Sequence, residues 1–276
     1  MMSSRRSLPV KRALRFVYTS LLCCLAWIIN PKVRLKGLIA VRRDLKASDD
    51  LLLVAPGSSV RGLTQDDWDG FWNHDRLFVN YAALHESFRL GDLLSTEPHE
   101  TIAEFVDGVA ELDGPVLLKG FTSLSNVHVC LKSIWHLRRV RNRVIMIREI
   151  DASDLWNFPV VDDYYGDYFA NDGLSNIAVL DGASLVYFLN AGLRMGYRSI
   201  TLVGFDFDNQ YFFDEEDAGQ HGGDNAQAAP PKHILNWDDF LIRKVNRIIK
   251  QADLKGCDIQ SYKSRVNIRH LDRSRL

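Results

Sequence analysis

Few cysteines occur in the sequence, and their spacing excludes two kinds of site. The 276 residues include four of them, Cys23, Cys24, Cys130 and Cys257. This spacing matches neither a zinc site nor the disulfide framework of a small secreted domain. We therefore expect the protein to work in a reducing compartment, the cytoplasm.

The sequence also lacks an apolar run long enough to cross a bilayer comfortably. The N-terminal run, Phe16 to Ile29, has 14 residues, whereas a membrane-spanning helix needs about 20. Basic residues flank this run on both sides, and no small-residue cleavage site of a signal peptide follows it. The pattern is typical of a segment that lies in the interface of an anionic cytoplasmic leaflet. The alternative is a core helix with solvated flanks.

The net charge is close to zero, but charges of the two signs are separated along the chain. Of the 34 lysines and arginines, 11 lie within residues 1–46, where Asp44 is the single acid. Residues 47–276 hold the other 23 bases together with 34 acids. We therefore expect two parts, a basic membrane-associated segment over 1–46 and a globular domain over 47–276. The acidic domain argues against binding to nucleic acid.

Short apolar runs that alternate with helical patterns predict an α/β domain with a mostly parallel sheet flanked by helices. The helical patterns are clearest from Ala183 to Met195, which Gly196 closes, and from Trp237 to Ala252. A polar stretch rich in glycine, alanine and proline, at about 208–236, predicts a lid loop. The strand-like runs lie at 51–55, 77–80, 116–119, 144–147, 200–203 and 257–261.

The residues that follow these runs are the place to seek a ligand site, because ligands of open parallel sheets bind at the carboxyl ends of the strands. A Gly-Ser-Ser turn follows the first run, and its amides and hydroxyls can cradle a phosphate. The chain has neither the Gly-x-Gly-x-x-Gly dinucleotide turn nor a Walker loop. The candidates are Gly57, Ser58, Ser59, Asn80, Ser184, Gly204, Asp206 and, in the loop before the last long helix, His233.

The order of these residues resembles the bacterial family 42 sialyltransferases and related transferases of 3-deoxy-octulosonate (Kdo). Two features come early: an apolar strand that runs into a Gly/Ser turn (54–59), and a strand that ends in Asn (78–80). A Ser-bearing helix then closes on Gly-Tyr and leads to a strand and Gly-x-Asp-Phe (184–207). A His-x-x-Asn step (233–236) precedes the last long helix. The resemblance covers residues 50–262 in order and is most specific over 181–207.

This resemblance implies a Rossmann-like domain of the GT-A-variant type. It implies transfer, with inversion and with no metal or other cofactor, of sialic acid, Kdo or a related acidic 2-keto sugar. The donor would be a CMP-sugar and the acceptor a hydroxyl of a bacterial surface glycan or glycolipid, in lipopolysaccharide or capsule, at the cytoplasmic face of the inner membrane. The oligomeric state stays open, a homo-oligomer included.

The resemblance also implies roles for individual residues. Gly57, Ser58, Ser59 and Asn80 would contact the nucleotide, and Ser184 would lie beside the phosphate or the sugar. His233 would take the proton of the acceptor, since a neutral imidazole is basic near pH 7. The remaining members of the implied donor site are Gly204, Asp206, Tyr211 and Asn236.

Two other functions are open on the same residues. Asp206 and Asp208 match the Asp-x-Asp pattern with which metal-dependent glycosyltransferases hold Mn²⁺ or Mg²⁺ on a nucleoside diphosphate sugar. A non-catalytic scaffold is the second alternative, because Pro56 stands where relatives usually have Asn, and Asp208 would repel a leaving phosphate. Tyr211 would replace the tyrosine that relatives carry at the position of Asp208. His221, also in the expected lid, is the alternative base.

Overall fold

The computed structural model describes most of the chain, and every structural statement below concerns that part. The described residues are 7–45, 48–88, 92–98, 102–112, 114–119, 127–141, 143–151, 177–180, 184–206, 237–264 and 267–270.

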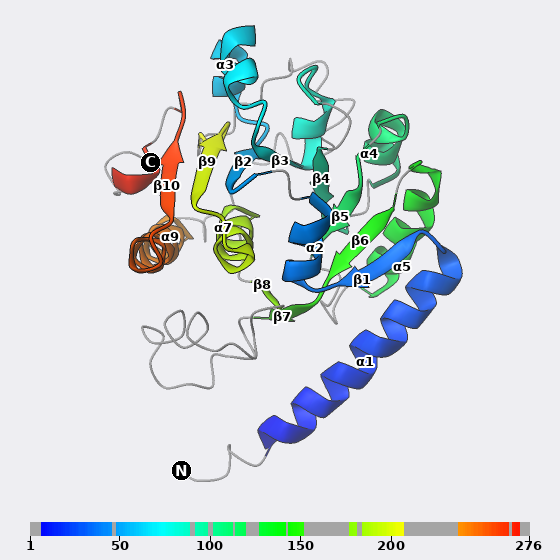
Figure 1. The fold of residues 1–276 in the computed structure, drawn as a ribbon. Coiled ribbons are helices and arrows are strands. Elements are labelled where there is room, and N and C mark those ends of the chain that lie inside the picture. Colours follow the sequence, from blue (N-terminus) through cyan, green and yellow to red (C-terminus); the bar gives the residue numbers. More distant parts are fainter. Residues whose placement is uncertain are drawn as a thin grey trace.

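One eight-stranded sheet forms the centre of the molecule (Figure 1). Its strand order is β1-β6-β5-β4-β3-β2-β9-β10, and all neighbouring strands are parallel. A second, two-stranded sheet pairs β7 (Glu149–Asp151) with β8 (Ala178–Leu180). The strands of the large sheet are β1 (Val33–Lys36), β2 (Asp50–Val54), β3 (Asp75–Val79), β4 (Leu93–Thr96), β5 (Val116–Leu118), β6 (Val144–Ile147), β9 (Ser199–Val203) and β10 (Asp258–Ser261).

Helices cover both faces of this sheet, which is why its strands are apolar on both sides (Figure 1). Leu51 and Leu53 of β2 face a core shared with α2, α7 and α9, whereas Leu52 and Val54 face a core shared with α1, α3, α4 and α5. The helices are α1 (Ser7–Ile29), α2 (Leu38–Leu45), α3 (Gln65–Gly70), α4 (Ile102–Val109), α5 (Val127–His136), α7 (Ser184–Met195) and α9 (Trp237–Leu254), with 3₁₀ turns η1 (Ser58–Gly62), η2 (Asn80–Leu84), η4 (Leu137–Arg139) and η9 (Ile268–His270).

The expected α/β class with a mostly parallel sheet is confirmed. Each of the six predicted runs forms a strand, and the two clearest helical patterns are α7 and α9. Gly196 adopts a φ of +77° directly after α7, the left-handed conformation that ends a helix and that glycine adopts without strain. The expected lid at 208–236 lies outside the described residues.

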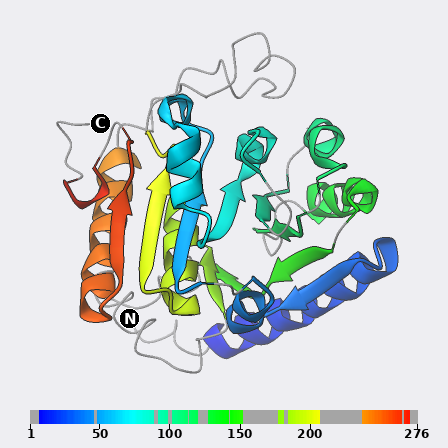
Figure 2. The ribbon, with the colours of Figure 1, turned by 45° about the horizontal axis from the view of Figure 1, so that its top comes forward.

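The basic N-terminal segment contributes to the same fold. β1 pairs with β6 at the edge of the sheet, and α1 packs beside β1 and α5 with Leu22 and Ala26 buried (Figure 2). Asn30 at the end of α1 donates from Nδ2 to the carbonyl oxygen of Ile134, at 3.3 Å. Residues on both sides of the expected division at 46 therefore build one sheet. No helix in the described part is long and apolar enough to span a membrane.

Candidate functional site

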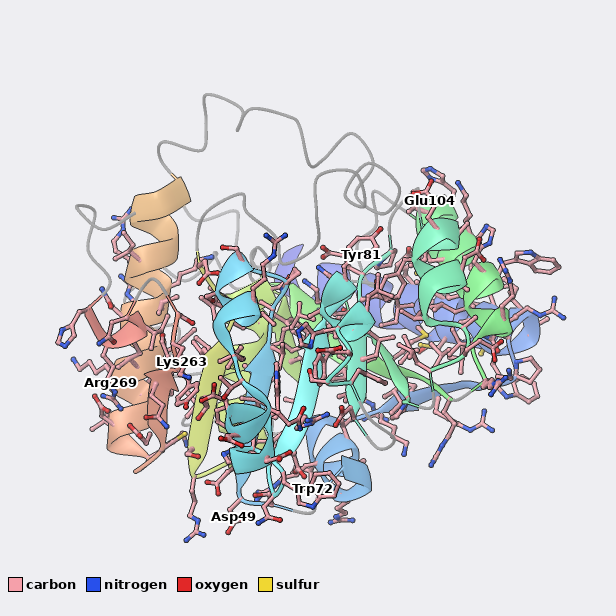
Figure 3. The ribbon with its side chains drawn as sticks, turned by 90° about the horizontal axis from the view of Figure 1, so that it is seen from above. Asp49, Trp72, Tyr81, Glu104, Lys263 and Arg269 are labelled. Carbon is pink, nitrogen blue, oxygen red and sulfur yellow. The ribbon has the colours of Figure 1, made fainter. Side chains whose placement is uncertain are left out.

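The strand order creates one switch point, between β2 and β9. From β2 the chain adds β3, β4, β5 and β6 successively on one side, and later adds β9 and β10 on the other side. Crossover connections on either side of such a point diverge, and ligands of open α/β sheets bind there, at the carboxyl ends of the strands. Figure 3 shows Tyr81, which follows β3, at the opposite end of the sheet from Asp49 and Trp72, which precede β2 and β3.

At the switch point the two chain segments touch through their backbones. The Gly57 amide donates to the carbonyl oxygen of Gly204, at 2.9 Å. A Cβ on Gly57 would lie 2.2 Å from that oxygen, and a Cβ on Gly204 would lie 2.1 Å from the carbonyl oxygen of Ala55. Gly204 also has a φ of +73°. Both glycines are therefore required by the close approach of the two strand ends.

Asp206 fixes the turn that follows β2. Its Oδ2 accepts a hydrogen bond from the Ser59 amide at 2.7 Å, near the start of η1, and the residue is 5% exposed. A carboxylate at this place orients the first amide groups of the turn, as a helix cap does. Asp206 is thus engaged with protein backbone. The second acid of the Asp-x-Asp pattern, Asp208, lies outside the described residues, which contain no group of three potential metal ligands.

Four buried oxygen atoms near the carboxyl ends of β2, β3 and β4 have no hydrogen-bond partner among the described residues. They are Oγ of Ser58, Ser59 and Ser95 and Oδ1 of Asn80. Leaving such a group unsatisfied costs about 1–3 kcal/mol, so each of them calls for an explanation. A polar ligand that supplies donors to these atoms provides one.

Asn80 is also the site of backbone strain. Its φ is +52°, in the left-handed region that L-residues with a side chain rarely adopt. Asparagine tolerates this conformation better than most residues, and here it turns the chain from β3 into η2. Strain together with an unpartnered side-chain oxygen is characteristic of a functional position.

Ser184 also lies at the carboxyl ends of the strands, here called the carboxyl edge, as distinct from the lateral edge strands. It is hydrogen-bonded to a residue that the sequence did not indicate. Because α7 returns the chain to the amino end of β9, its first turn lies at the carboxyl edge. There Lys119 Nζ, directly after β5, donates to Ser184 Oγ at 2.5 Å and pairs with Glu97 Oε2 at 3.0 Å. The signal that could have indicated this residue is a lysine directly after a fully apolar strand, because its side chain begins at the buried end of that strand.

The structure therefore brings part of the predicted site together. Gly57, Ser59, Gly204 and Asp206 are in direct contact. Asn80, directly after β3, and Ser184, at the start of α7, lie at the same edge without a bond to that group. Tyr211, His221, His233 and Asn236 lie outside the described residues.

Comparisons with known proteins give one similar structure. No family model matches the chain, and a search of curated proteins finds no match. The α-2,3-sialyltransferase from Campylobacter jejuni in apo form superposes with a TM-score of 0.41 and 13% sequence identity, over 78% of this chain and 76% of that chain. A similarity of this extent supports no conclusion about activity or substrate.

Proposed function

We propose that the protein is a glycosyltransferase that moves an acidic 2-keto sugar from a CMP donor to a hydroxyl of a glycan. One observation carries this proposal: three of the four buried oxygens without partners at the carboxyl edge belong to Ser58, Ser59 and Asn80, which the sequence resemblance assigns to the nucleotide. The resemblance and the hydrogen-bonding pattern are independent of each other.

Groups at the carboxyl edge can supply the donors that this reaction requires. The bond between the anomeric carbon and the CMP phosphate oxygen breaks, and the electron pair leaves with CMP. Hydroxyl donors stabilise such a leaving group when they are fixed in advance. The hydroxyls of Ser58 and Ser59 have no partner among the described residues, and the bond from the Ser59 amide to Asp206 fixes the backbone that carries them. The new bond forms to the acceptor oxygen, whose proton passes to the imidazole of His233 in this proposal.

Binding of nucleotides tests the proposal without knowledge of the acceptor. CMP should raise the unfolding free energy, by about 2.7 kcal/mol at 100 times its dissociation constant, and UDP and GDP should not. Cytidine, which lacks the phosphate, is the matched control. Purified protein should then release CMP from CMP-sialic acid or CMP-Kdo, and His233→Ala should slow this release.

Three outcomes would contradict the proposal. No stabilisation by any cytidine nucleotide would favour the scaffold alternative. Preference for a nucleoside diphosphate together with loss of activity in EDTA would favour the metal-dependent alternative with Asp206 and Asp208. Binding of CMP without turnover of either donor would remove the acidic 2-keto sugar from the proposal.

We also propose that the protein docks on an anionic membrane surface through α1, where a glycolipid acceptor would be presented. Six of the nine exposed large hydrophobic side chains in the described part lie on α1 and β1. Four of them, at positions 17, 21, 25 and 28, recur at the spacing of one helix face and are 54%, 60%, 45% and 68% exposed. The excess of bases in residues 1–46 complements anionic lipid.

Vesicle sedimentation tests this docking. The double variant Leu21→Glu, Ile28→Glu should bind vesicles of phosphatidylserine and phosphatidylcholine at least about 10-fold more weakly, because two apolar side chains are lost from the interface. Leu254→Glu changes a side chain that is 73% exposed on α9 and serves as the matched control. Equal binding by all three proteins, or equal binding to pure phosphatidylcholine vesicles, would contradict the docking proposal.

A further inference from the structure

Lys119 is a buried cation at the proposed site whose role the fold does not explain. Its side chain is 1% exposed, and lysine is almost never fully buried unless it is paired. Its backbone amide donates to the carbonyl oxygen of Thr96 at 2.9 Å, which continues the pairing of β5 with β4. The strand therefore fixes where the ammonium lies, at the carboxyl edge and on the face of the sheet that α7 covers.

The pairing of this ammonium is weak for a buried charge. Its ionic partner, Glu97, is 48% exposed, so solvent screens the attraction. An ammonium has three donors, and the described residues supply acceptors for two of them, Glu97 and Ser184. The ring centroids of Tyr187 and Phe188 lie at 5.9 and 5.8 Å from Nζ, in cation–π contact, which adds attraction but accepts no hydrogen bond in the manner of an oxygen.

Two further features add to the positive potential or to the hydrogen-bonding capacity at this place. Ser184 is the first residue of the 12-residue helix α7, whose N-terminus carries a partial positive charge. Ser95 is fully buried, and its Oγ has no partner in the described part of the chain. Ser95 and Lys119 share the face of the sheet that α7 covers, because side chains alternate along β4 and β5 and Ser95 pairs with Leu117.

We propose that Lys119, Ser184, Ser95 and the start of α7 form an oxyanion subsite that binds the charged group of the donor sugar. The inference rests on the proposed function and adds the residues that would make the site selective for an acidic sugar. β5 is three strand spacings from β2 in the sheet order, about 14 Å at 4.8 Å for each spacing. The subsite requires that a nucleotide held at the switch point extend its sugar end, rather than its base, across this distance toward Lys119.

Binding of the oxyanion is an exchange of partners. The ligand's oxygens take the third donor of Lys119 and compete with Glu97, whose half-exposed carboxylate can turn to solvent. Glu97 thus keeps the ammonium paired when the subsite is empty, and it also repels the incoming anion. A buried cation without any partner would be more costly than this arrangement.

Three variants test the subsite by titration without acceptor. Lys119→Met keeps the length of the side chain and removes its charge, Lys119→Arg keeps the charge, and Glu97→Gln removes the competing carboxylate. We expect Lys119→Met to lower the affinity for CMP-sialic acid about 10-fold, as loss of a hydrogen bond to a charged group implies. The affinity for CMP itself should change less than about 2-fold, and Lys119→Arg should restore most of the affinity for CMP-sialic acid. Glu97→Gln should tighten CMP-sialic acid by about 3-fold.

The outcomes separate the subsite from a merely structural tether between β5 and α7. Equal weakening of CMP and CMP-sialic acid binding by Lys119→Met would overturn the assignment of the subsite to the donor sugar, because CMP carries no sugar carboxylate. Unchanged affinity for both ligands would overturn it. If Lys119→Met does not fold, Glu97→Gln decides: a tether predicts no change in ligand affinity, and that result would overturn the subsite.

The proposed function can fail while the subsite stands, and a simpler probe distinguishes the two failures. If no CMP donor binds the wild-type protein, titration with inorganic phosphate and with free sialic acid still reports on the oxyanion site. Binding of either anion to the wild type, with higher affinity in Glu97→Gln, would support the subsite without supporting the proposed function. No effect of these anions on the wild type would overturn the subsite as well.

Discussion

The two edges of the central sheet treat their buried polar groups differently. At the amino edge, Arg76 forms a buried ion pair with Asp92 and donates to the carbonyl oxygen of Ser87, and Tyr197 donates to Asp75 at 2.7 Å. At the carboxyl edge, the oxygens of three serines and Asn80 have no partner among the described residues. The buried charges at the amino edge are thus paired within the protein, although Nη1 of Arg76 and Nδ1 of His74 also lack a partner in the described part of the chain. At the carboxyl edge, the serine hydroxyls and Asn80 Oδ1 have no such pairing, and the proposed function assigns them to a ligand.

This contrast predicts that changes at the two edges separate stability from ligand affinity. A variant of the amino edge should lose stability and keep its affinity for nucleotide. A variant that removes the hydroxyls of the unpartnered serines should keep its stability and lose affinity for nucleotide, because these hydroxyls contribute no hydrogen bond to the folded protein. Changes to the backbone contact at the switch point should affect both quantities.

The largest effect is expected from breaking the ion pair at the amino edge. The side chains of Arg76 and Asp92 are 4% and 9% exposed, and removal of one member leaves an uncompensated buried charge. Asp92→Ala should therefore lower the unfolding free energy by about 3–5 kcal/mol, measured by urea denaturation. The matched control is Arg198→Ala, whose pair with Asp49 is on the surface and which should cost less than about 1 kcal/mol. Weaker CMP binding by refolded Asp92→Ala would break the contrast.

The next effect should come from the switch point. Gly204→Ala places a Cβ against the carbonyl oxygen of Ala55 and puts alanine at a φ of +73°. The left-handed conformation alone costs about 1–2 kcal/mol, and the clash separates the segment from Ala55. Both stability and CMP affinity should fall. Gly62→Ala, in η1, meets nothing within 4 Å and is the control that should change neither.

Asp67 of α3 sharpens the comparison because its partners follow the carboxyl end of β10 and yet, unlike the serine hydroxyls, its carboxylate is fully partnered within the protein. It accepts hydrogen bonds from Lys263 and Tyr262, which follow β10, and from the Thr64 amide. The bond from Lys263, then those from Tyr262 and Thr64, hold the pKa of this carboxyl well below its usual range. Its contribution to stability is therefore present above the unfolded pKa of about 3.9 and is lost as the pH falls below it.

The expected result is an acid-dependent loss of stability that Asp67→Asn diminishes. Urea midpoints between about pH 5 and pH 2.5 should fall less steeply for this variant than for the wild type, while CMP affinity at pH 7 stays the same. Asp66→Asn, on the exposed side of the same helix, should keep the wild-type slope. Parallel pH profiles for Asp67→Asn and the wild type would contradict the assignment.

The strands that sequence predicted and those that it missed differ in their surroundings. The runs that form β2, β3 and β9 are apolar because both faces are covered, and such runs stand out. β4 was missed because Ser95 and Thr96, both fully buried, interrupt the apolar pattern at the site. β1 was missed because an edge strand with alternating charges resembles a solvated segment.

The site was predictable to the extent that strand ends share one edge. That rule selected Gly57, Ser59, Gly204 and Asp206 before any contact between them was known, since parallel strands end on the same side. It could not show that Asp206 caps the turn after β2, because that contact joins residues 147 positions apart. Lys119 was overlooked because a lysine after an apolar run is usually the solvated end of a strand.

The central claim is that the unpartnered oxygens at the switch point exist to bind the donor, and Ser58→Ala with Ser59→Ala tests it most directly. The double variant keeps the Ser59 amide on Asp206 and removes only the two hydroxyls. We predict an unfolding free energy equal to or slightly above that of the wild type, together with CMP binding about 10-fold weaker. A clear loss of stability with unchanged CMP affinity would contradict the account.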